Sequence, residues 1–302
     1  MFFSVIIPTY NRAALLGEAL KSVFAQTFKD YEIIVVDDGS TDGTEEMLAG
    51  LAGKVRYYRQ ENKGPGAARN LGIYNAAGDY VAFLDSDDVW LTWTLEVYAE
   101  AITENAQPNF VTGHGEPREQ EFEITSGQWP RRFLKTKDFL ELSEIRYGFA
   151  GTPGMTVKTQ VVRMAGGFVD RFINGEDQDL CLRLGTAPGF VYIESPPVYL
   201  QRTDATHVSR DLDKSIAGIN LLLEREHAGV YPGGPDREKV RRGIIGSAAR
   251  SVSINCAKEG NIPEALRLYQ VTFGWQWQQG RWKYLLGFHL FILTRMLKSK
   301  RP

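Results

Sequence analysis

The sequence is poor in cysteine: among 302 residues there are 2, Cys181 and Cys256, and they lie far apart. Two distant cysteines cannot build a disulfide framework or a cysteine-based zinc cluster. The chain also lacks an excess of either charge, since 35 basic and 37 acidic side chains give a formal net charge of −2. This balance provides no global positive field and argues against a nucleic-acid partner. We expect a cytoplasmic protein, because the scarce cysteines fit a reducing compartment.

Long apolar runs are missing as well. The N-terminus has no basic region ahead of an apolar stretch, so it does not have the form of a signal peptide. No segment reaches the roughly 20 apolar residues that a membrane-spanning helix needs. The nearest approach lies between Tyr284 and Leu293 and is framed by basic residues. A helix over Trp282–Leu297 would be about 24 Å long, which is short of a hydrocarbon core of roughly 30 Å.

Two interpretations of residues 281–301 remain open. The segment either lies peripherally on the inner face of the cytoplasmic membrane, where its cations meet anionic lipid, or packs against protein. In the second case the partner is the catalytic domain or another subunit of a homo-oligomer.

The chain does contain a regular alternation of strand and helix patterns over its first hundred residues. The expected strands are Ser4–Pro8, Glu32–Val36, Val55–Tyr58 and Tyr80–Leu84, and the expected helices are Arg12–Gln26, Thr44–Leu51 and Pro65–Ala76. The second and fourth strands lack alternating polar residues, which is typical of strands buried on both faces. This order predicts an α/β fold with a mostly parallel, twisted sheet, flanking helices and right-handed crossovers.

The rest of the chain is less regular at first and then helical. Residues 105–150 contain a polar run and scattered aromatic side chains, and we interpret them as partner-facing loops and short elements. Strands are expected at Met155–Lys158 and at Val191–Leu200, where the pair Pro196-Pro197 breaks the second. The pattern after these strands indicates helices. The expected regions are 1–104, 105–210 and a helical C-terminal region, 211–302.

Acidic side chains gather where the expected strands end. Asp37 and Asp38 end the second strand, and Asp85, Asp87 and Asp88 end the fourth. Ligands bind at this edge of open α/β sheets. A solvated acidic turn explains any one pair, but two carboxylate groups at one edge repel each other unless a cation joins them. The spacing of Asp85 and Asp87 offers hard oxygen ligands for Mg²⁺ or Mn²⁺ bridging phosphate oxygens.

Several stretches carry motifs in a fixed order. They run over 4–12, 32–44, 62–70 and 83–88, followed by a later stretch over 166–183 that contains Gly175-Glu176-Asp177. Together these stretches resemble the family 2 glycosyltransferases, and the last resembles the acceptor-side motif of that family. The resemblance covers about residues 1–210. It implies a GT-A fold, in which a Rossmann-like nucleotide half precedes an acceptor half. The implied activity is transfer of a sugar from a nucleotide diphosphate donor with inversion.

The resemblance also implies which residues bind the nucleotide. Thr9, Asp38 and Arg69 would hold the nucleobase, and Pro8 and Tyr10 would shape its pocket.

A second implied set of residues serves the metal and the chemistry. Asp85 would meet both the ribose and the metal, and Asp87 would bind the metal directly. His207 is a further candidate metal ligand, with a surface or loop histidine as the ordinary alternative. Asp177 would be the general base and the adjoining Glu176 its alternative. Acids that merely favour a helix N-terminus are the competing interpretation of this pair.

Elementary chemistry requires the same acidic groups. Breaking the anomeric C–O bond leaves a diphosphate, whose charge a divalent cation neutralises. Direct displacement needs an acceptor hydroxyl deprotonated on the opposite face, which a positioned carboxylate achieves. The resemblance, with which this chemistry agrees, predicts a metal-dependent, inverting, non-processive glycosyltransferase of the hexosyltransferase type. The family suggests a UDP-sugar donor, a saccharide or lipid-linked saccharide acceptor, and a role in cell-surface polysaccharide or glycolipid synthesis.

Other interpretations remain. A catalytically silent nucleotide-sugar-binding or scaffold protein would use the same fold, and a degraded metal or base motif would favour it. A nucleotidyltransferase usually has a glycine-rich basic loop after its first strand, which this chain lacks. Trp90 and Trp93 either stack on a sugar ring or pack in a helix core. Arg202 and Arg210 either contact the diphosphate or are solvated.

Overall fold

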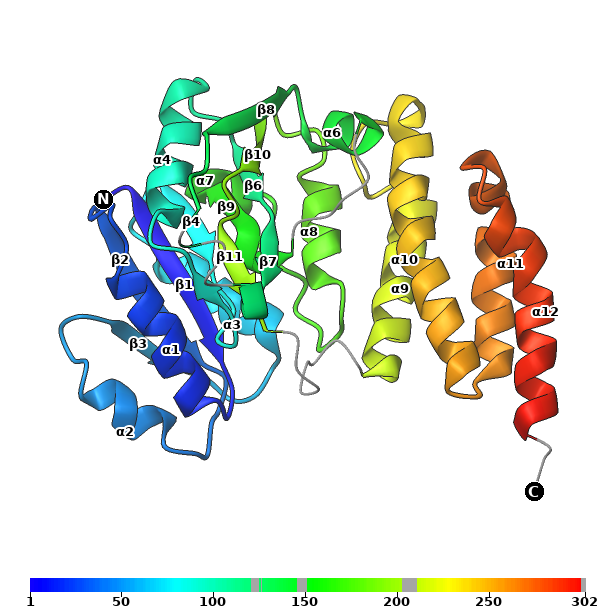
Figure 1. Ribbon diagram of the computed structural model, residues 1–302, viewed down its shortest axis with the longest axis horizontal. Coiled ribbons are helices and arrows are strands. Elements are labelled where there is room, and N and C mark those ends of the chain that lie inside the picture. Colours follow the sequence, from blue (N-terminus) through cyan, green and yellow to red (C-terminus); the bar gives the residue numbers. More distant parts are fainter. Residues whose placement is uncertain (121–124, 126, 146–150, 203–210, 300–302) are drawn as a thin grey trace. The chain divides into compact units, whose positions relative to one another are not determined.

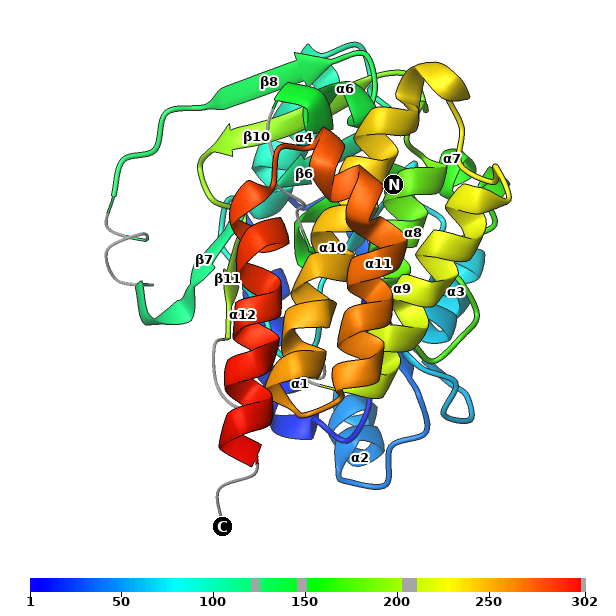
Figure 2. The ribbon, with the colours of Figure 1, turned by 90° about the vertical axis from the view of Figure 1, so that its right-hand side faces the viewer.

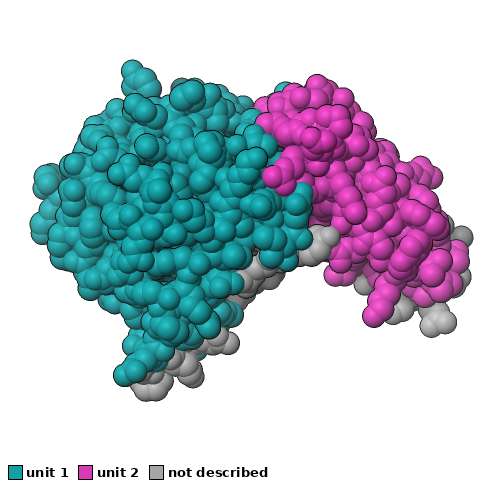
Figure 3. All heavy atoms as spheres, turned by 90° about the horizontal axis from the view of Figure 1, so that it is seen from above, with its two compact units in different colours: residues 1–172, 176–207 teal, residues 173–175, 208–302 magenta. Residues whose placement is uncertain are grey.

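The structure is a computed structural model of residues 1–302, and it describes all of them except 121–124, 126, 146–150, 203–210 and 300–302. The chain divides into two compact units, which are coloured separately in Figure 3. The first unit comprises Met1–Phe172 and Glu176–His207, and the second comprises Ile173–Gly175 and Val208–Pro302.

The first unit is built on an eight-stranded sheet of order β3-β2-β1-β4-β9-β6-β10-β8 (Figure 1). Its strands are β1 (Phe3–Thr9), β2 (Tyr31–Asp37), β3 (Arg56–Arg59), β4 (Tyr80–Phe83), β6 (Phe110–Gly113), β8 (Arg132–Thr136), β9 (Met155–Lys158) and β10 (Phe190–Ser195). β1 to β4 are mutually parallel, as are β6 and β10. β9 runs antiparallel to both β4 and β6, and β8 runs antiparallel to β10. The α/β fold with a mostly parallel sheet is thus confirmed.

Helices cover both faces of this sheet. They are α1 (Ala13–Phe24), α2 (Thr44–Ala49), α3 (Pro65–Asn75), α4 (Thr94–Glu104), α6 (Phe139–Ile145), α7 (Thr159–Met164) and α8 (Glu176–Arg183). On one face, Val5 and Ile7 of β1 share a buried core with Leu16 of α1 and Leu95 of α4. On the other face, α3 approaches so closely that a Cβ on Gly72 would lie 2.5 Å from the Ile6 side chain. Since both faces are covered, the middle residues of β1 and β2 are apolar without alternation.

A second, three-stranded sheet was not foreseen. It has the order β5-β11-β7, formed by β5 (Val89–Trp90), β11 (Tyr199–Gln201) and β7 (Gly115–Pro117). The single broken strand expected over Val191–Leu200 is therefore two strands, β10 and β11, in different sheets. The short elements expected within 105–150 are β6, β7, β8 and α6.

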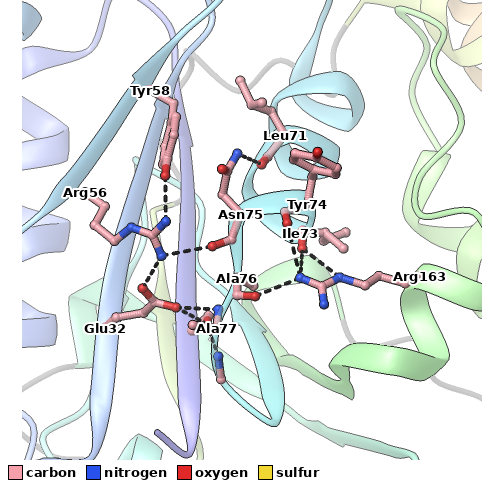
Figure 4. A network of polar contacts seen from close by, with 12 residues as sticks. Glu32, Arg56, Tyr58, Leu71, Ile73, Tyr74, Asn75, Ala76, Ala77 and Arg163 are labelled. Atoms are coloured by element: carbon pink, nitrogen blue, oxygen red, sulfur yellow. Dashed lines mark hydrogen bonds and ion pairs between the residues drawn. The ribbon is translucent and has the colours of Figure 1, made fainter.

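Polar contacts close the amino edge of the main sheet (Figure 4). The Glu32 carboxylate accepts hydrogen bonds from Ser4 Oγ (2.6 Å), Arg56 Nη1 (2.6 Å) and Ala77 N (2.7 Å). Arg163 of α7 donates to backbone carbonyls at the end of α3, those of Ile73 (2.8 Å), Tyr74 (3.2 Å) and Ala76 (2.7 Å). These contacts satisfy carbonyl groups that a helix end leaves without intrahelical partners.

The second unit is helical, which confirms the expected helical C-terminal region. Its helices are α9 (Leu212–His227), α10 (Glu238–Lys258), α11 (Ile262–Gln278) and α12 (Trp282–Ser299), seen side by side in Figure 2. Asp211 caps α9 by accepting from Lys214 N at 3.1 Å, and Asn261 caps α11 by accepting from Glu264 N at 3.3 Å. Among the described residues, no helix combines the length and the apolar character needed to cross a membrane.

Candidate active site

Most of the candidate site residues near the strands lie at the carboxyl edge of the main sheet. Since β1, β2 and β4 are parallel neighbours, their carboxyl ends meet there. Thr9 ends β1, Asp37 ends β2, and Asp85 and Asp87 lie in the turn that follows β4. A backbone hydrogen bond from Asp88 N to Asp85 O (3.1 Å) closes this turn.

Asp38 is tied to the loop that precedes α3. Its Oδ1 accepts from Gln60 Nε2 (2.7 Å) and Lys63 N (2.9 Å), and its Oδ2 accepts from Gly64 N (2.8 Å). Gly64 has φ +91°, and a Cβ there would lie 2.5 Å from the Phe172 ring. Asp38 therefore shapes the loop with the same carboxylate that the resemblance assigns to the nucleobase.

The segment after β1 forms a buried floor with one exposed ring. Pro8 and Thr9 are buried, while Tyr10 is 45% exposed. Thr9 Oγ1 has no hydrogen-bond partner among the described residues. A buried hydroxyl without a partner costs about 1–3 kcal/mol, so this oxygen is suited to a ligand. Asn11 follows at φ +52°, with its N donating to Ser40 Oγ (2.8 Å).

Arg69 links the sheet edge to the acceptor-side motif. Its Nη2 donates to Asp85 Oδ1 (2.6 Å) and its Nη1 to Glu176 Oε1 (2.8 Å), while the guanidinium lies 5.2 Å from the Phe168 ring centre. Burial alone would lower the pKa of Arg69, but the two carboxylates outweigh it and raise that pKa above its usual range. Arg69 thus binds a residue that lies 107 positions further along the sequence, Glu176.

The other carboxylates of the turn are also close to arginines. Arg12 Nη1 lies 2.5 Å from Asp87 Oδ2. Asp88 is buried, and its Oδ1 accepts from Arg202 N at 3.2 Å. Burial, with Asp85 and Asp87 nearby, raises the pKa of Asp88 to about 8. The sequence motif contained Arg12 but suggested no role for it, because its partner lies far along the chain.

The donor set fits a small, hard cation that shares its ligands with a phosphate. Asp85 and Asp87 supply carboxylate oxygens, which suit Mg²⁺ and Mn²⁺. The described residues contain no cluster of three or more His, Cys, Asp or Glu side chains that would hold a metal by itself. Such ions commonly use one or two carboxylates together with substrate phosphates. His207 and Arg210 lie outside the described residues.

Asp177 and Glu176 begin α8 in different electrostatic settings. Arg69 neutralises Glu176, whereas Asp177 forms no ion pair within the described part of the chain. Asp177 Oδ1 accepts from Gln178 N at 2.7 Å. Burial, and then the Glu176 carboxylate, raise the pKa of Asp177 to about 7. A carboxylate with this pKa is suited to accept a proton near neutral pH.

Two residues that the sequence analysis left without a role position this motif. Asn70 Oδ1 accepts from Phe168 N (2.7 Å) and its Nδ2 donates to Phe168 O (2.9 Å), while Arg183 Nη2 donates to Gly167 O (2.5 Å). Asn70 thereby binds the start of the acceptor-side motif to α3, and Arg183 binds it to α8. Their spacing gave no signal, since both contacts depend on the folded chain.

The contacts of Trp90 and Trp93 favour packing over stacking on a sugar ring. Trp90 is buried and its Nε1 donates to Pro153 O (3.1 Å), and Trp93 Nε1 donates to Pro197 O (3.0 Å). Trp90 belongs to the interior, and the half-buried Trp93 packs against the core. Arg202 Nη2 donates to Glu18 Oε2 at 3.1 Å, so its side chain is held within the fold.

Comparison with known proteins gives a consistent family. The model of "Glycosyl transferase family 2" matches residues 4–158. An uncharacterized glycosyltransferase of Rickettsia conorii is 48% identical over 113 residues, which are 37% of this chain and 18% of that protein. A GalNAc(5)-diNAcBac-PP-undecaprenol beta-1,3-glucosyltransferase of Campylobacter jejuni is 41% identical over 106 residues, 33% of this chain and 34% of that protein. The matches thus span at most about a third of these relatives.

Solved structures show the same fold over most of the chain. S. aureus TarS 1–349 in complex with UDP-GlcNAc has a TM-score of 0.58 and 20% identity, covering 93% of this chain and 92% of that one. The mannosyltransferase PcManGT from Pyrobaculum calidifontis, in complex with GDP-Man and Mn²⁺, has a TM-score of 0.54 and 20% identity, covering 99% and 88%. With the family model matching more than half of its residues, this chain, with its GT-A-like fold, belongs to glycosyltransferase family 2.

Proposed function

We propose that this protein is a metal-dependent, inverting glycosyltransferase that moves a sugar from a UDP-sugar to an acceptor hydroxyl. The observation that carries the proposal is the chain of contacts from Asp85 through Arg69 to Glu176, beside an Asp177 whose pKa is raised to about 7. These contacts support a proposed metal-binding turn and a proposed proton acceptor that act in one cluster. The uridine nucleotide is supported by the TarS complex with UDP-GlcNAc, which shares the fold.

The nucleotide would bind at the carboxyl ends of β1, β2 and β4. Thr9 offers a buried hydroxyl without a partner, and Pro8 and Tyr10 form the floor and the exposed ring beside it. Asp38, which follows β2, and Arg69, in α3, would contact the nucleobase, and Asp85 would meet the ribose.

The divalent cation, Mn²⁺ or Mg²⁺, would be held by Asp87 and Asp85, with His207 as a further candidate ligand. When bound, it neutralises the charge that develops on the departing diphosphate. The PcManGT complex, which contains Mn²⁺ and a sugar nucleotide, supports this assignment through the shared fold.

The role of general base is assigned to Asp177. Its carboxylate accepts the proton of the acceptor hydroxyl while the hydroxyl oxygen bonds to the anomeric carbon, and the bond from that carbon to the diphosphate breaks on the opposite face. The configuration at the anomeric carbon is inverted because the displacement is direct. Glu176 is the alternative base, but Arg69 already holds it as an ion pair.

The acceptor would be a saccharide or a lipid-linked saccharide used for cell-surface polysaccharide or glycolipid. The name of the Campylobacter relative, which specifies an undecaprenol-linked glycan, supports a lipid-linked acceptor. Peripheral contact with the cytoplasmic membrane would suit such an acceptor.

A panel of nucleotide sugars tests the proposal. The chain is incubated with each donor and Mn²⁺ or Mg²⁺, and thermal stabilisation and slow donor hydrolysis are measured. We expect one UDP-sugar to stabilise the protein and to be hydrolysed only with a cation. A catalytically silent binding protein would be stabilised by the donor but would release no sugar, and that result would overturn the proposed activity.

A further inference from the structure

Over its described side chains, helix α12 is apolar on two faces, of which one is buried and the other exposed. Leu285, Phe288 and Ile292 are buried, and the Phe288 ring stacks on Tyr269 of α11 with ring centres 4.9 Å apart. On the other face, Leu286, Leu290 and Leu293 are exposed by 76%, 67% and 55%. A helix that only completes a core does not need this second stripe.

The exposed stripe continues into aromatic side chains. Trp282 begins α12 and is 44% exposed, and its ring meets that of Trp277 on α11 edge to face at 4.3 Å. Phe273, one turn earlier on α11, is 41% exposed and stacks on Trp277. We call the six side chains Phe273, Trp277, Trp282, Leu286, Leu290 and Leu293 the outer surface of the second unit.

The sequence around the outer surface carries charge of one sign. Glu264 is the last acidic residue of the chain. The following residues, 265–302, include the basic side chains Arg267, Arg281, Lys283, Arg295, Lys298, Lys300 and Arg301. Both Arg281 and Lys283 adjoin the exposed Trp282 in the sequence. Residues 265–302, which include Trp277, Trp282 and the three exposed leucines, therefore carry a net positive charge.

We propose that the outer surface docks on an anionic lipid surface, lying in its plane. Leucines suit the acyl boundary, tryptophans suit the headgroup level, and basic side chains meet anionic headgroups. The absence of a membrane-spanning helix among the described residues agrees with an in-plane position. A second copy of this chain is the weaker occupant, because it would bring the same positive charge to the contact. The proposal does not depend on the glycosyl transfer proposed above.

Vesicle binding tests this docking. The full chain is sedimented with vesicles of phosphatidylcholine alone or of phosphatidylcholine with phosphatidylglycerol. We expect binding to the anionic vesicles only, weakened by high salt. The triple variant Leu286→Ser/Leu290→Ser/Leu293→Ser should bind at least about a hundredfold less, because each leucine loses an apolar transfer term. The matched control is Tyr74→Ser/Met164→Ser, which alters side chains 81% and 87% exposed in the first unit and should bind like the parent.

Two further measurements distinguish a lipid surface from a second copy of the chain as the partner of the outer surface. Thermal melting shows whether the triple variant is folded, which we expect because its changes lie at exposed positions. Light scattering after size exclusion gives the mass of parent and variant. Loss of a dimer in the variant, or a parent that ignores anionic vesicles, would overturn lipid docking. Donor hydrolysis by the triple variant should equal that of the parent, so a failed docking test leaves the proposed activity untouched.

A separate observation concerns Arg12. Its guanidinium occupies Asp87 Oδ2, and the two side chains are only 21% and 13% exposed. The backbone around it is fixed, since Thr41 N donates to Asn11 Oδ1 (2.7 Å) and Ala13 N donates to Asp42 Oδ2 (3.0 Å).

From this pair we infer that Arg12 is an internal counter-ion that competes with the divalent cation for Asp87. Without a cation the crowded carboxylates of the turn need positive charge nearby, and Arg12 and Arg69 supply it. A cation bound to Asp87 requires Arg12 to release this oxygen. The anionic diphosphate of a donor then offers the released guanidinium a new partner, so cation and donor should bind together.

Binding of Mn²⁺ alone tests this competition, using the electron paramagnetic resonance signal of the free ion. Arg12→Gln should bind Mn²⁺ about tenfold tighter than the parent without nucleotide, as expected when a competing pair of about 1.4 kcal/mol is removed. Arg12→Lys keeps the charge and should stay near the parent. The matched control, Arg131→Gln, removes an arginine paired with Glu100 at 2.7 Å and should change nothing. Equal or weaker Mn²⁺ binding by a folded Arg12→Gln protein would overturn the inference.

Discussion

The two edges of the main sheet carry acidic side chains in opposite states. At the amino edge, Glu32 accepts three hydrogen bonds. Burial would raise its pKa, but the bonds from Ser4 and Arg56 outweigh it and lower that pKa. At the carboxyl edge, burial and neighbouring carboxylates raise the pKa of Asp88 to about 8 and that of Asp177 to about 7.

This difference separates stability from function within one set of strands. A carboxylate whose charged form is fully bonded stabilises the fold at neutral pH. Crowded carboxylates with raised pKa values cost stability, and such groups gather where chemistry is performed. Substitutions at the amino edge should therefore lower stability, whereas substitutions at the carboxyl edge should lower transfer activity.

The largest effect is expected for Asp177→Asn. Asparagine keeps the size and the hydrogen bond but cannot accept a proton, so transfer should fall about 10²–10⁴-fold with donor affinity nearly unchanged. Steady-state transfer and donor titration measure the two quantities. If transfer survives here and Glu176→Gln abolishes it, the neighbouring carboxylate is the base.

Next in size is the metal turn. Asp87→Ala removes one of two proposed ligand oxygens, and losing several kcal/mol of charge stabilisation corresponds to at least about a hundredfold loss of transfer. Donor-induced thermal stabilisation by Mn²⁺ should disappear as well, while the melting temperature without ligand stays near that of the parent. Full transfer in the presence of a chelator would contradict the metal assignment.

The pH profile should show a smaller, graded effect. The base must be deprotonated, so with the pKa of Asp177 at about 7, the transfer rate should fall about tenfold per pH unit below 7 and level off above it. Glu176→Gln removes the carboxylate that helps to raise this pKa. Provided that the variant still transfers, its pH profile should move to lower pH. An unshifted profile would mean that a group other than Asp177 causes the fall in rate at low pH.

Strand length and burial decided which strands could be predicted from the sequence. β1, β2 and β4 were predictable because their apolar runs are buried on both faces. β7 and β11 have three residues each and give no periodic signal, so their sheet was missed. The acidic residues near strand ends could be predicted as candidate site residues because carboxylates at that position suit a metal or a nucleotide.

Their partners were not predictable. Arg12 meets Asp87, and Asn70 meets Phe168, only after distant segments fold together. Local spacing contains no information about such contacts, because register between elements is decided by tertiary packing.

The smallest effect, confined to stability, is expected at the amino edge. Glu32→Gln keeps the shape of a side chain that is 8% exposed but replaces one accepting oxygen with a donor. One of three donors then faces another donor, which costs about 1–3 kcal/mol of unfolding free energy. Because folding lowers the pKa of Glu32, its contribution is present above the unfolded pKa and is lost as pH falls through the folded one. Urea unfolding at pH 7 should therefore give a lower unfolding free energy for the variant than for the parent, and the difference should shrink toward pH 3.

Glu45→Gln, at a side chain 59% exposed, is the control and should change the unfolding free energy by less than about 0.5 kcal/mol. Transfer by Glu32→Gln should match the parent wherever both are folded, and a loss of transfer without a loss of stability would contradict the division between the two edges.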